Sequence, residues 1–454
     1  MRQKPVNGLQ LQDIHKQRRI IVFSPYCLVA FLYMALAALA ALDASLINFE
    51  LLPFFPGLRW IRVHLITLGM LTESAFGILP VLVAARAGLS PPKIRWDIWL
   101  TLNLGLLILL VGIPLVNAVL ITTGGTLVFI AAALLMVQLG KMNATGSVTD
   151  TFQGRRFYLA GLTYLLLGIL VGTGLWQGWS TWLQIKVPIE VHIHANNWGF
   201  MSLVFAGLLT DLYPSFAGRS LAWPRSISPI FWMMTLGALG LVLGPWFQSN
   251  FFSVPGLIMH LSATIWLLLN VIKPLVADPQ LWTPGMLHLI TAYAWILAPV
   301  LIAPLIILQV PGFPGAGIEQ NAPQALIYGW VLQFGYAMIP LLFRRIFLPD
   351  TPPKLGGNWF SLIAVHLGGI FLWTGIFLHE YQAPLRGAAY ALWFLSMIPV
   401  AYELWQSIRV GTACPAVRSE ATTIGAAPLA LCQALREPQR SYRTTGKQSF
   451  QNWR

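Results

Sequence analysis

The chain has 454 residues, of which 57% are hydrophobic and only 9% charged, and its formal net charge is +13. A soluble domain carries roughly a quarter of charged residues, so this composition excludes an ordinary soluble protein. The basic excess does not by itself indicate nucleic acid, because basic loops orient membrane proteins. Cys27, Cys414 and Cys432 form neither a CxxC nor a CxxCH motif, which argues against c-type haem attachment, a zinc knuckle and a disulfide framework.

Long apolar runs predict an all-α polytopic membrane protein with about twelve transmembrane helices. No leader with a cleavage site precedes the first run, so we expect that run to be retained. We expect a cytoplasmic segment at 1–19, a membrane domain at 20–409 and a flexible cytoplasmic tail at 410–454. In chain order, the predicted spans are 20–46, 62–85, 97–116, 121–140, 157–177, 189–212, 228–247, 254–276, 286–309, 325–343, 359–379 and 387–408.

Basic residues gather in alternate loops. With the N-terminus placed inside, the outside loops hold only Arg59, Arg62, Lys186 and Arg386, and the inside loops hold nearly all other Lys and Arg residues. This bias predicts that both termini are cytoplasmic. We expect a multi-pass protein of a prokaryotic-type cytoplasmic membrane, with the lipid bilayer as its partner and no nucleic acid.

Three of these helices share one pattern. His64, His194 and Gln324 lie 130 residues apart, in "RVHLITLGMLTESAFGILP", "HIHANNWGFMSLVFAGLLTDLYP" and "QALIYGWVLQFGYAMIP". The sequence therefore predicts three four-helix arcs, at about 20–150, 151–280 and 281–409. A glycine five residues after each polar residue would either leave room for a flat macrocycle or allow close helix packing. These glycines are Gly69, Gly199 and Gly329.

Polar, ionisable side chains in a membrane span usually have a function. His64, His192 and His194 all fall in the first turns of spans that enter from the outside. Residues two apart on a helix point about 200° apart, so His192 and His194 would serve two different sites. We expect His64 and His194 to ligate a metal or a haem.

The other histidines are weaker candidates. His260 enters from the outside and His366 reaches mid-membrane, so they could supply two ligands to a second metal. His288 begins its span at the inner surface, and we expect a structural role for it. His15 and His379 lie at the membrane surfaces, and we assign them no function.

At these residues the chain resembles catalytic subunit I of the haem-copper oxidase superfamily, in its C-type oxidase and nitric oxide reductase branches. The resemblance is carried by "HIHANNWGF" and "RVHLITLGMLTESAFGILP". It implies twelve helices in three arcs, haem b (one, or two) and copper or non-haem iron. Carried over to this sequence, the resemblance implies that His64 and His194 are the axial pair of a low-spin haem and that His192 is the ligand of a second haem. It also implies an electron-donor protein or other membrane-complex subunits as partners, and O2 or NO as the gas.

The chain departs from that family in several places. The family places His-x-His on the tenth helix, whereas here it lies on the sixth and Gln324 stands in the tenth. No His-His dipeptide and no "HLWVEG"-type glutamate motif is present. The segment "LHLITAYAWILAP" is similar to NnrS, a membrane-protein family of the NO response that also binds haem and copper; this likeness would make His288 a ligand.

Further polar residues fit such chemistry. Arg59 and Arg62, with Lys186, lie at the outer end, where they could hold haem propionates or simply anchor the interface. Glu73 and Asp211 are intramembrane acids that could relay protons or hydrogen-bond neighbouring helices.

Three functions remain open. The first is a haem-bearing oxidoreductase that transfers electrons and reduces O2 or NO. The second is an NnrS-like haem or copper NO-response protein without turnover. The third is a transporter without haem, with polar side chains lining a substrate route.

Overall fold

The computed structural model describes residues 25–55, 57–90, 92–142, 153–307, 310–348 and 351–413. Across these ranges the protein is helical and has no strand, as predicted for an all-α polytopic membrane protein. Eleven helices in them are long and apolar enough to cross a membrane, and α5 (Trp96–Gly112) is a shorter apolar helix. The predicted 1–19 segment, which includes His15, and almost all of the 410–454 tail lie outside the described residues.

Successive four-helix stretches of the chain have matching elements. The first contains α2 (Pro25–Asn48), a long helix made of α3 (Leu58–His64), η1 (Leu65–Thr72) and α4 (Glu73–Arg86), then α5 and α6 (Ala118–Lys141). The second contains α7 (Gly154–Gln177), the short α8 (Trp179–Trp182), a long helix made of α9 (Pro188–His194), η3 (Ala195–Met201) and α10 (Ser202–Ala217), then α11 (Ile227–Phe247) and α12 (Asn250–Ile272).

The third stretch follows the same order with one difference. Its first helix is divided by a turn into α13 (Pro284–Thr291) and α14 (Ala294–Ile307), where a single span was predicted at 286–309. Its long helix consists of α15 (Gly315–Ala325), η6 (Leu326–Leu332) and α16 (Gln333–Phe347), and α17 (Trp359–Phe377) and α18 (Gln382–Ala413) follow. Short 3-10 turns, η4 (Pro224–Ser226), η5 (Pro279–Leu281) and η7 (His379–Tyr381), lie in the connections.

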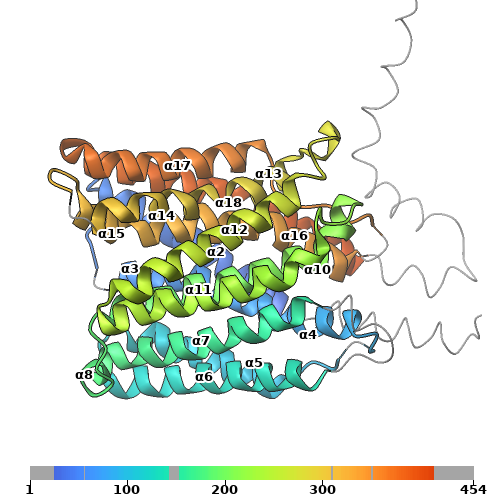
Figure 1. Cartoon of the computed structure of the whole chain (residues 1–454), viewed down its shortest axis with the longest axis horizontal. Helices are drawn as coiled ribbons and strands as arrows, with labels where there is room; N and C mark the ends of the chain where they lie inside the picture. Colours follow the sequence, from blue (N-terminus) through green and yellow to red (C-terminus); the bar gives the residue numbers. More distant parts are fainter. Residues whose placement is uncertain are drawn as a thin grey trace, which may run out of the picture.

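The three long helices, at 58–86, 188–217 and 315–347, form the centre of the bundle. In their most apolar stretches 67%, 72% and 100% of residues are buried, against 33–50% in the other eight spanning helices. The outer helices pair as hairpins, α5 with α6, α11 with α12 and α17 with α18, and α18 also packs against α2. First and last stretches of the chain are therefore neighbours, so the bundle closes on itself (Figure 1).

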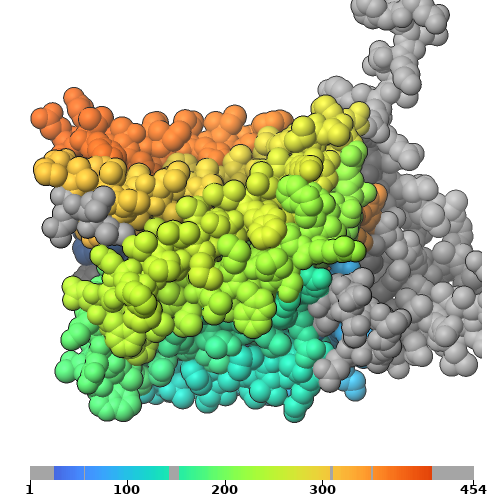
Figure 2. Space-filling model, in the orientation of Figure 1, coloured from blue at the N-terminus to red at the C-terminus, as the bar shows by residue number. Residues whose placement is uncertain are grey.

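The outer surface is apolar along the helices. On α5 the side chains of Leu100, Leu104, Leu107 and Val111 are exposed, at the three- and four-residue spacing of one helical face. Figure 2 shows one flank of the bundle, where teal, green, yellow and orange segments form adjacent parallel bands. Such a surface suits contact with lipid tails rather than water.

The two ends of the bundle are named here by the residues at them. α3 and α9 begin at one end, close to His64 and His194, which we call the histidine end; it lies at the left in Figure 1. α2, α5 and α7 begin at the opposite end, where α4, α10 and α16 finish.

Candidate functional site

Each central helix contains one π-helical segment, and the three segments are in register. They begin at residues 65, 195 and 326, so they are 130 and 131 residues apart. η1 and η3 begin directly after His64 and His194, and η6 begins two residues after Gln324. A π segment widens the turn and misaligns side chains before and after it, and such segments are frequent at functional sites.

His64 is held by its own helix. Its Nδ1 lies 2.8 Å from the Trp60 carbonyl oxygen, and the Trp60 ring stacks on the imidazole with centroids 4.2 Å apart. Trp60 is four residues earlier, so it lies one turn away on the same face. The His64 side chain remains partly exposed.

His192 is held by the neighbouring helix α7. Its Nδ1 lies 2.8 Å from the Gly168 carbonyl oxygen, and a Cβ on Gly172 would come within 2.6 Å of the imidazole. The ring centroids of His64 and His192 are 6.3 Å apart, with an interplanar angle of 29°. The two central helices thus bring one imidazole each to a common place.

His194 faces another helix. Its Nδ1 lies 2.6 Å from the Leu241 carbonyl oxygen on α11, whereas His192 contacts α7. The two histidines therefore serve different surroundings, as their spacing predicts. The imidazole that lies beside His64 is that of His192. The expected pairing of His64 with His194 at a haem stays a prediction.

These three histidines share one chemical arrangement. In each, Nδ1 is placed to donate to a backbone carbonyl oxygen, which leaves Nε2 as the nitrogen with the free lone pair. In the described part of the chain, no hydrogen bond reaches any of the three Nε2 atoms. This is the arrangement of metal-ligating histidines, whose second nitrogen is normally fixed by a carbonyl or carboxylate.

Arg62 is a buried cation next to the last repeat. Its Nη2 donates to the Tyr390 hydroxyl at 2.9 Å, and its guanidinium carbon lies 4.2 Å from the centre of the same ring. The Tyr390 hydroxyl donates in turn to Gln324 Oε1 at 3.2 Å. Gln324, the counterpart of His64 and His194, therefore belongs to a hydrogen-bond chain with Arg62.

Two more arginines lie close by. Arg59 donates to the Gln320 carbonyl oxygen at 2.7 Å, and Arg386 donates to Asn321 Oδ1 at 2.9 Å. We call Arg59, Arg62 and Arg386 the arginine cluster. Of the described Asp and Glu residues, none forms an ion pair with it. The cluster gives this end of the bundle a cationic patch that suits an anionic group; whether haem propionates bind there stays a prediction, and Arg386 was not among the predicted residues.

His260 is a satisfied core residue. Its Nε2 lies 3.2 Å from both Ser202 Oγ and the Trp198 carbonyl oxygen, and its ring meets Trp198 edge to face. The Nδ1 atom lies 3.4 Å from Thr264 Oγ1. Both nitrogens therefore have protein partners.

His366 is also enclosed by protein partners. Its Nε2 lies 2.8 Å from Thr291 Oγ1 and 3.0 Å from Gln333 Nε2, and its Nδ1 accepts from Trp295 Nε1 at 3.1 Å. Its network is separate from that of His260. No group of three or more His, Cys, Asp or Glu side chains that could hold a metal occurs in the described ranges. The expected second metal at His260 and His366 has no geometric support.

His288 lies against α17 and the loop before it. Its Nε2 is 2.9 Å from Ser361 Oγ, and its ring meets the Tyr336 ring edge to face. A Cβ on Gly357 would come within 2.4 Å of the imidazole. These contacts fit the structural role that its position predicts, at the end opposite to the histidine pair.

The two intramembrane acids differ from each other. The Tyr158 hydroxyl donates to Asp211 Oδ2 at 2.8 Å, and Asp211 lies against Gly154 at the start of α7, where a Cβ would come within 2.1 Å of that oxygen. Glu73 is fully buried, and neither of its oxygens has a hydrogen-bond partner among the residues described. Asp211 therefore joins two helices, whereas the role of Glu73 is not explained by packing.

The repeat glycines do not leave open space. A Cβ on Gly69 would come within 2.6 Å of the Tyr33 ring, on Gly199 within 2.3 Å of Tyr164, and on Gly329 within 2.4 Å of Trp295. The three aromatic residues are also equivalents, on the first helix of each repeat. These contacts are those of close helix packing, the second of the two predicted roles, and the macrocycle role stays a prediction.

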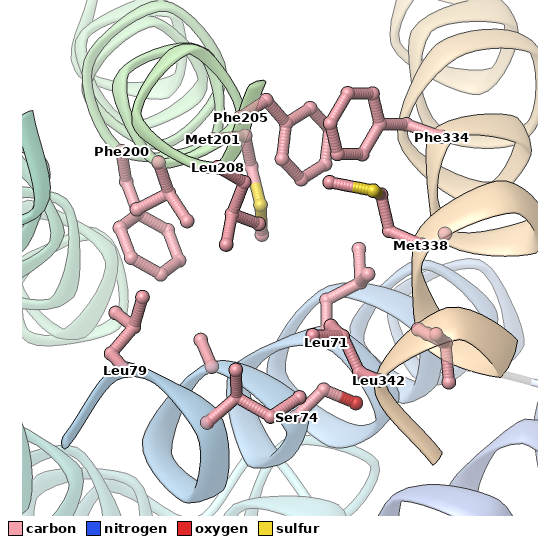
Figure 3. A pocket seen from close by; sticks show the side chains of 15 residues that line it. Leu71, Ser74, Leu79, Phe200, Met201, Phe205, Leu208, Phe334, Met338 and Leu342 are labelled. Carbon is pink, nitrogen blue, oxygen red and sulfur yellow. The ribbon is translucent and has the colours of Figure 1, made fainter. Parts of the chain in front are cut away.

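A small apolar cavity lies where the three central helices meet. Its volume is about 40 Å³, and all fifteen lining residues come from the three long helices. Figure 3 shows the rings of Phe205 and Phe334 together, with Leu71, Leu79, Met201 and Met338 around the space. Ser74 contributes the one polar side chain among these lining residues, and its hydroxyl donates a hydrogen bond to the Met70 carbonyl oxygen at 2.7 Å. Sequence patterns offered no signal for this cavity.

No family model matches the sequence, and no curated protein is significantly similar to it.

Proposed function

We propose that this protein binds a redox metal between His64 and His192, with haem b iron as the first candidate, and that it carries electrons within the membrane. One observation carries the proposal: two central helices bring together imidazoles whose centres are 6.3 Å apart. Both Nδ1 atoms are already engaged with backbone carbonyl oxygens. Such a pair costs hydration energy in a membrane protein, and metal binding would compensate that cost.

The donor set fits a single metal. Two imidazoles that each bind at about 2.0–2.1 Å place their ring centres roughly 6 Å apart, close to the separation found here. Two carbonyl oxygens, of Trp60 and Gly168, hold the rings in the tautomer that directs the Nε2 lone pair away from the backbone. These two carbonyl oxygens would hold the ligand nitrogens in place for a metal.

The residues around the pair define its chemistry. A haem held by His64 and His192 would supply one-electron transfer and would not bind gas readily. The arginine cluster near the same end could neutralise the carboxylates of such a group. His194, with its own free Nε2 and a different helix beside it, is the candidate ligand of a second haem, which would keep one face open for O2 or NO.

The relation to subunit I of the haem-copper oxidase superfamily is part of this proposal. The matching elements of three successive four-helix stretches and the histidines on central helices support it. Gln324, bonded to Tyr390, takes the place of a third central imidazole. Partners of the chain would then be an electron-donor protein or other membrane subunits, as the resemblance implies.

A copper ion bound directly by the same two imidazoles is the second candidate. The space beside His64 measures only about 10 Å³ and is lined by Tyr33, Trp60, Leu106 and other apolar side chains. A single ion needs no room for a macrocycle, and neutral imidazole is a good copper ligand. An NnrS-like NO-response role without turnover is compatible with either metal.

Optical spectra and metal analysis of the purified protein test the proposal. We expect a reduced-minus-oxidised b-type haem spectrum that is lost in His64→Ala and in His192→Ala, because each variant removes one axial ligand. His379→Ala is the matched control, since His379 is exposed at the surface. His194→Ala should keep the low-spin signal, which separates this pairing from a His64–His194 pair.

The outcomes are distinct. Copper without haem, lost in the same two variants, would favour the directly bound ion. A spectrum that CO shifts would indicate an open haem, and its loss in His194→Ala would assign that haem. If the folded protein contains neither haem nor copper, the metal proposal is wrong and a transporter becomes the better hypothesis.

A further inference from the structure

Glu73 occupies an unusual position in the fold. It is the first residue after η1, near the middle of the long helix at 58–86, and its exposed fraction is 0%. Neither carboxylate oxygen has a hydrogen-bond partner among the described residues, and no Lys or Arg of these ranges forms an ion pair with it. A charged carboxylate left alone in an apolar interior would cost several kcal/mol.

The first residues after the other two π segments are neutral. Ser202 follows η3 and Gln333 follows η6, and both are also fully buried. Ser202 Oγ lies 3.2 Å from His260 Nε2, and Gln333 Nε2 lies 3.0 Å from His366 Nε2. The position directly after a π segment therefore accepts a neutral polar side chain with a partner. An unpartnered acid is not required for packing, so its presence in the first repeat points to a function.

Polar side chains of α2 and α5 lie near Glu73. Tyr33 and Tyr26 of α2 are close enough to interact electrostatically with Glu73, and the Asn103 side chain of α5 lies near its carboxylate. The Tyr26 hydroxyl donates to the Arg95 carbonyl oxygen at 3.4 Å, at the start of α5.

Arg95 itself is exposed and forms an ion pair with Asp97 at this end, opposite to the histidine pair. α6, which also packs against α4, has no ionisable side chain before Lys141 at its last residue. Tyr26 and Tyr33 are two helical turns apart on α2, roughly 10 Å along its axis, so a proton route between them needs more than one bridging water molecule. Hydroxyl and amide groups thus lie between Glu73 and the end where α2 begins.

We propose that Glu73 is a proton-binding site inside the membrane, loaded from the end of the bundle at which α2 and α5 begin. The ligand is a proton: the carboxylate takes up one H⁺ from water at that end through Tyr26 and Tyr33, and releases it by the same route. No electron or other group is transferred in this step. His64 lies nine residues earlier on the same helix, nearer to the histidine end. The proton site does not depend on a metal bound at His64 and His192.

Carbodiimide labelling tests whether the acid is protonated. Dicyclohexylcarbodiimide enters apolar interiors and reacts with a carboxylic acid that holds its proton, which passes to the carbodiimide nitrogen as the new C–O bond forms. We expect mass spectrometry of the folded, detergent-solubilised chain to locate the adduct on Glu73. The label should disappear in Glu73→Gln and persist in Asp211→Asn, a matched control because Asp211 has its Tyr158 partner.

Infrared spectroscopy tests the route. The carbonyl-stretch band of a protonated acid should be lost in Glu73→Gln, and its shift on transfer to D2O should be slowed in Tyr33→Phe and Tyr26→Phe. Each Phe variant keeps the ring and removes only the hydroxyl.

An unlabelled Glu73 in folded wild-type protein would overturn the proposal. So would protection of Glu73 from the carbodiimide by sodium ions at constant pH, because that result assigns a metal cation rather than a proton. Unchanged exchange rates in both Phe variants would refute the route through α2. Because the labelling of the wild-type chain stands on its own, the proposal can be refuted even if Glu73→Gln does not fold.

Discussion

Replacing Gly199 by alanine tests how tightly the central helices are packed. An added Cβ would come within 2.3 Å of the Tyr164 ring, far inside van der Waals contact. The ring cannot move freely, since its hydroxyl donates to the Thr235 carbonyl oxygen at 2.7 Å. Alanine favours helix by about 1 kcal/mol over glycine, but overpacking a core costs about 1–3 kcal/mol, and here the hydroxyl bond adds about 1 kcal/mol to the loss. We therefore expect a net destabilisation of about 1–3 kcal/mol.

The assay is reversible unfolding in mixed micelles, followed by circular dichroism. Gly140→Ala is the control, because nothing lies within 4 Å of a Cβ built there, and it should be neutral or stabilising by up to about 1 kcal/mol. In a Tyr164→Ala background, Gly199→Ala should cost nothing, because the clashing ring is gone. Equal stabilities for Gly199→Ala and Gly140→Ala would refute the close-packing interpretation of the repeat glycines.

Two further variants probe the connections at the end opposite to the histidines. Asn270 accepts from the Trp223 amide at 2.7 Å and donates to Ser226 Oγ at 2.9 Å; Asn270→Ala should lower the free energy of unfolding by about 2 kcal/mol, and a thermal melt unchanged from wild type would contradict this. Glu403, about one-fifth exposed, forms an ion pair with Arg344 and accepts from a backbone amide; Glu403→Gln should cost about 1–2 kcal/mol, less at high salt, and a cost that salt does not change would rule out the charge as its source.

The proposed metal site and the proposed proton site lie on either side of one π-helical segment. Within one long helix, His64 lies directly before η1 and Glu73 directly after it. The segment changes which neighbours face the residues on each side, so one helix presents an imidazole to His192 and a carboxyl group to α2 and α5. The other two central helices have a neutral residue, Ser202 or Gln333, directly after the π segment, so this fold does not require an acid there.

The spacing of residues along the sequence was sufficient to predict some features of the site. The 130-residue interval identified His64, His194 and Gln324, and the observed π segments recur at almost the same interval. A His-x-His spacing of two residues correctly implied two different surroundings. These inferences succeed because helical periodicity is a local property, which the order of residues along one helix determines.

The side chains that contact these histidines and glycines could not be predicted from the sequence in the same way. His260 and His366 were candidate ligands of a second metal although their predicted depths differ. In the structure Ser202 and Gln333, each directly after a π segment, lie within hydrogen-bond distance of them. Tyr33, Tyr164 and Trp295 fill the glycine faces, although no local pattern ties them to residues far along the chain.

The amino-acid sequence by itself determined that this protein is a bundle of membrane-spanning helices with polar side chains at repeated positions, because hydropathy and periodicity act within single helices. Tertiary structure alone decided which imidazole meets His64, which acid stays without a partner, and where the small cavity forms. Those outcomes depend on how each helix is rotated and how far it shifts against its neighbours, and π-helical segments alter that rotation in the middle of the central helices.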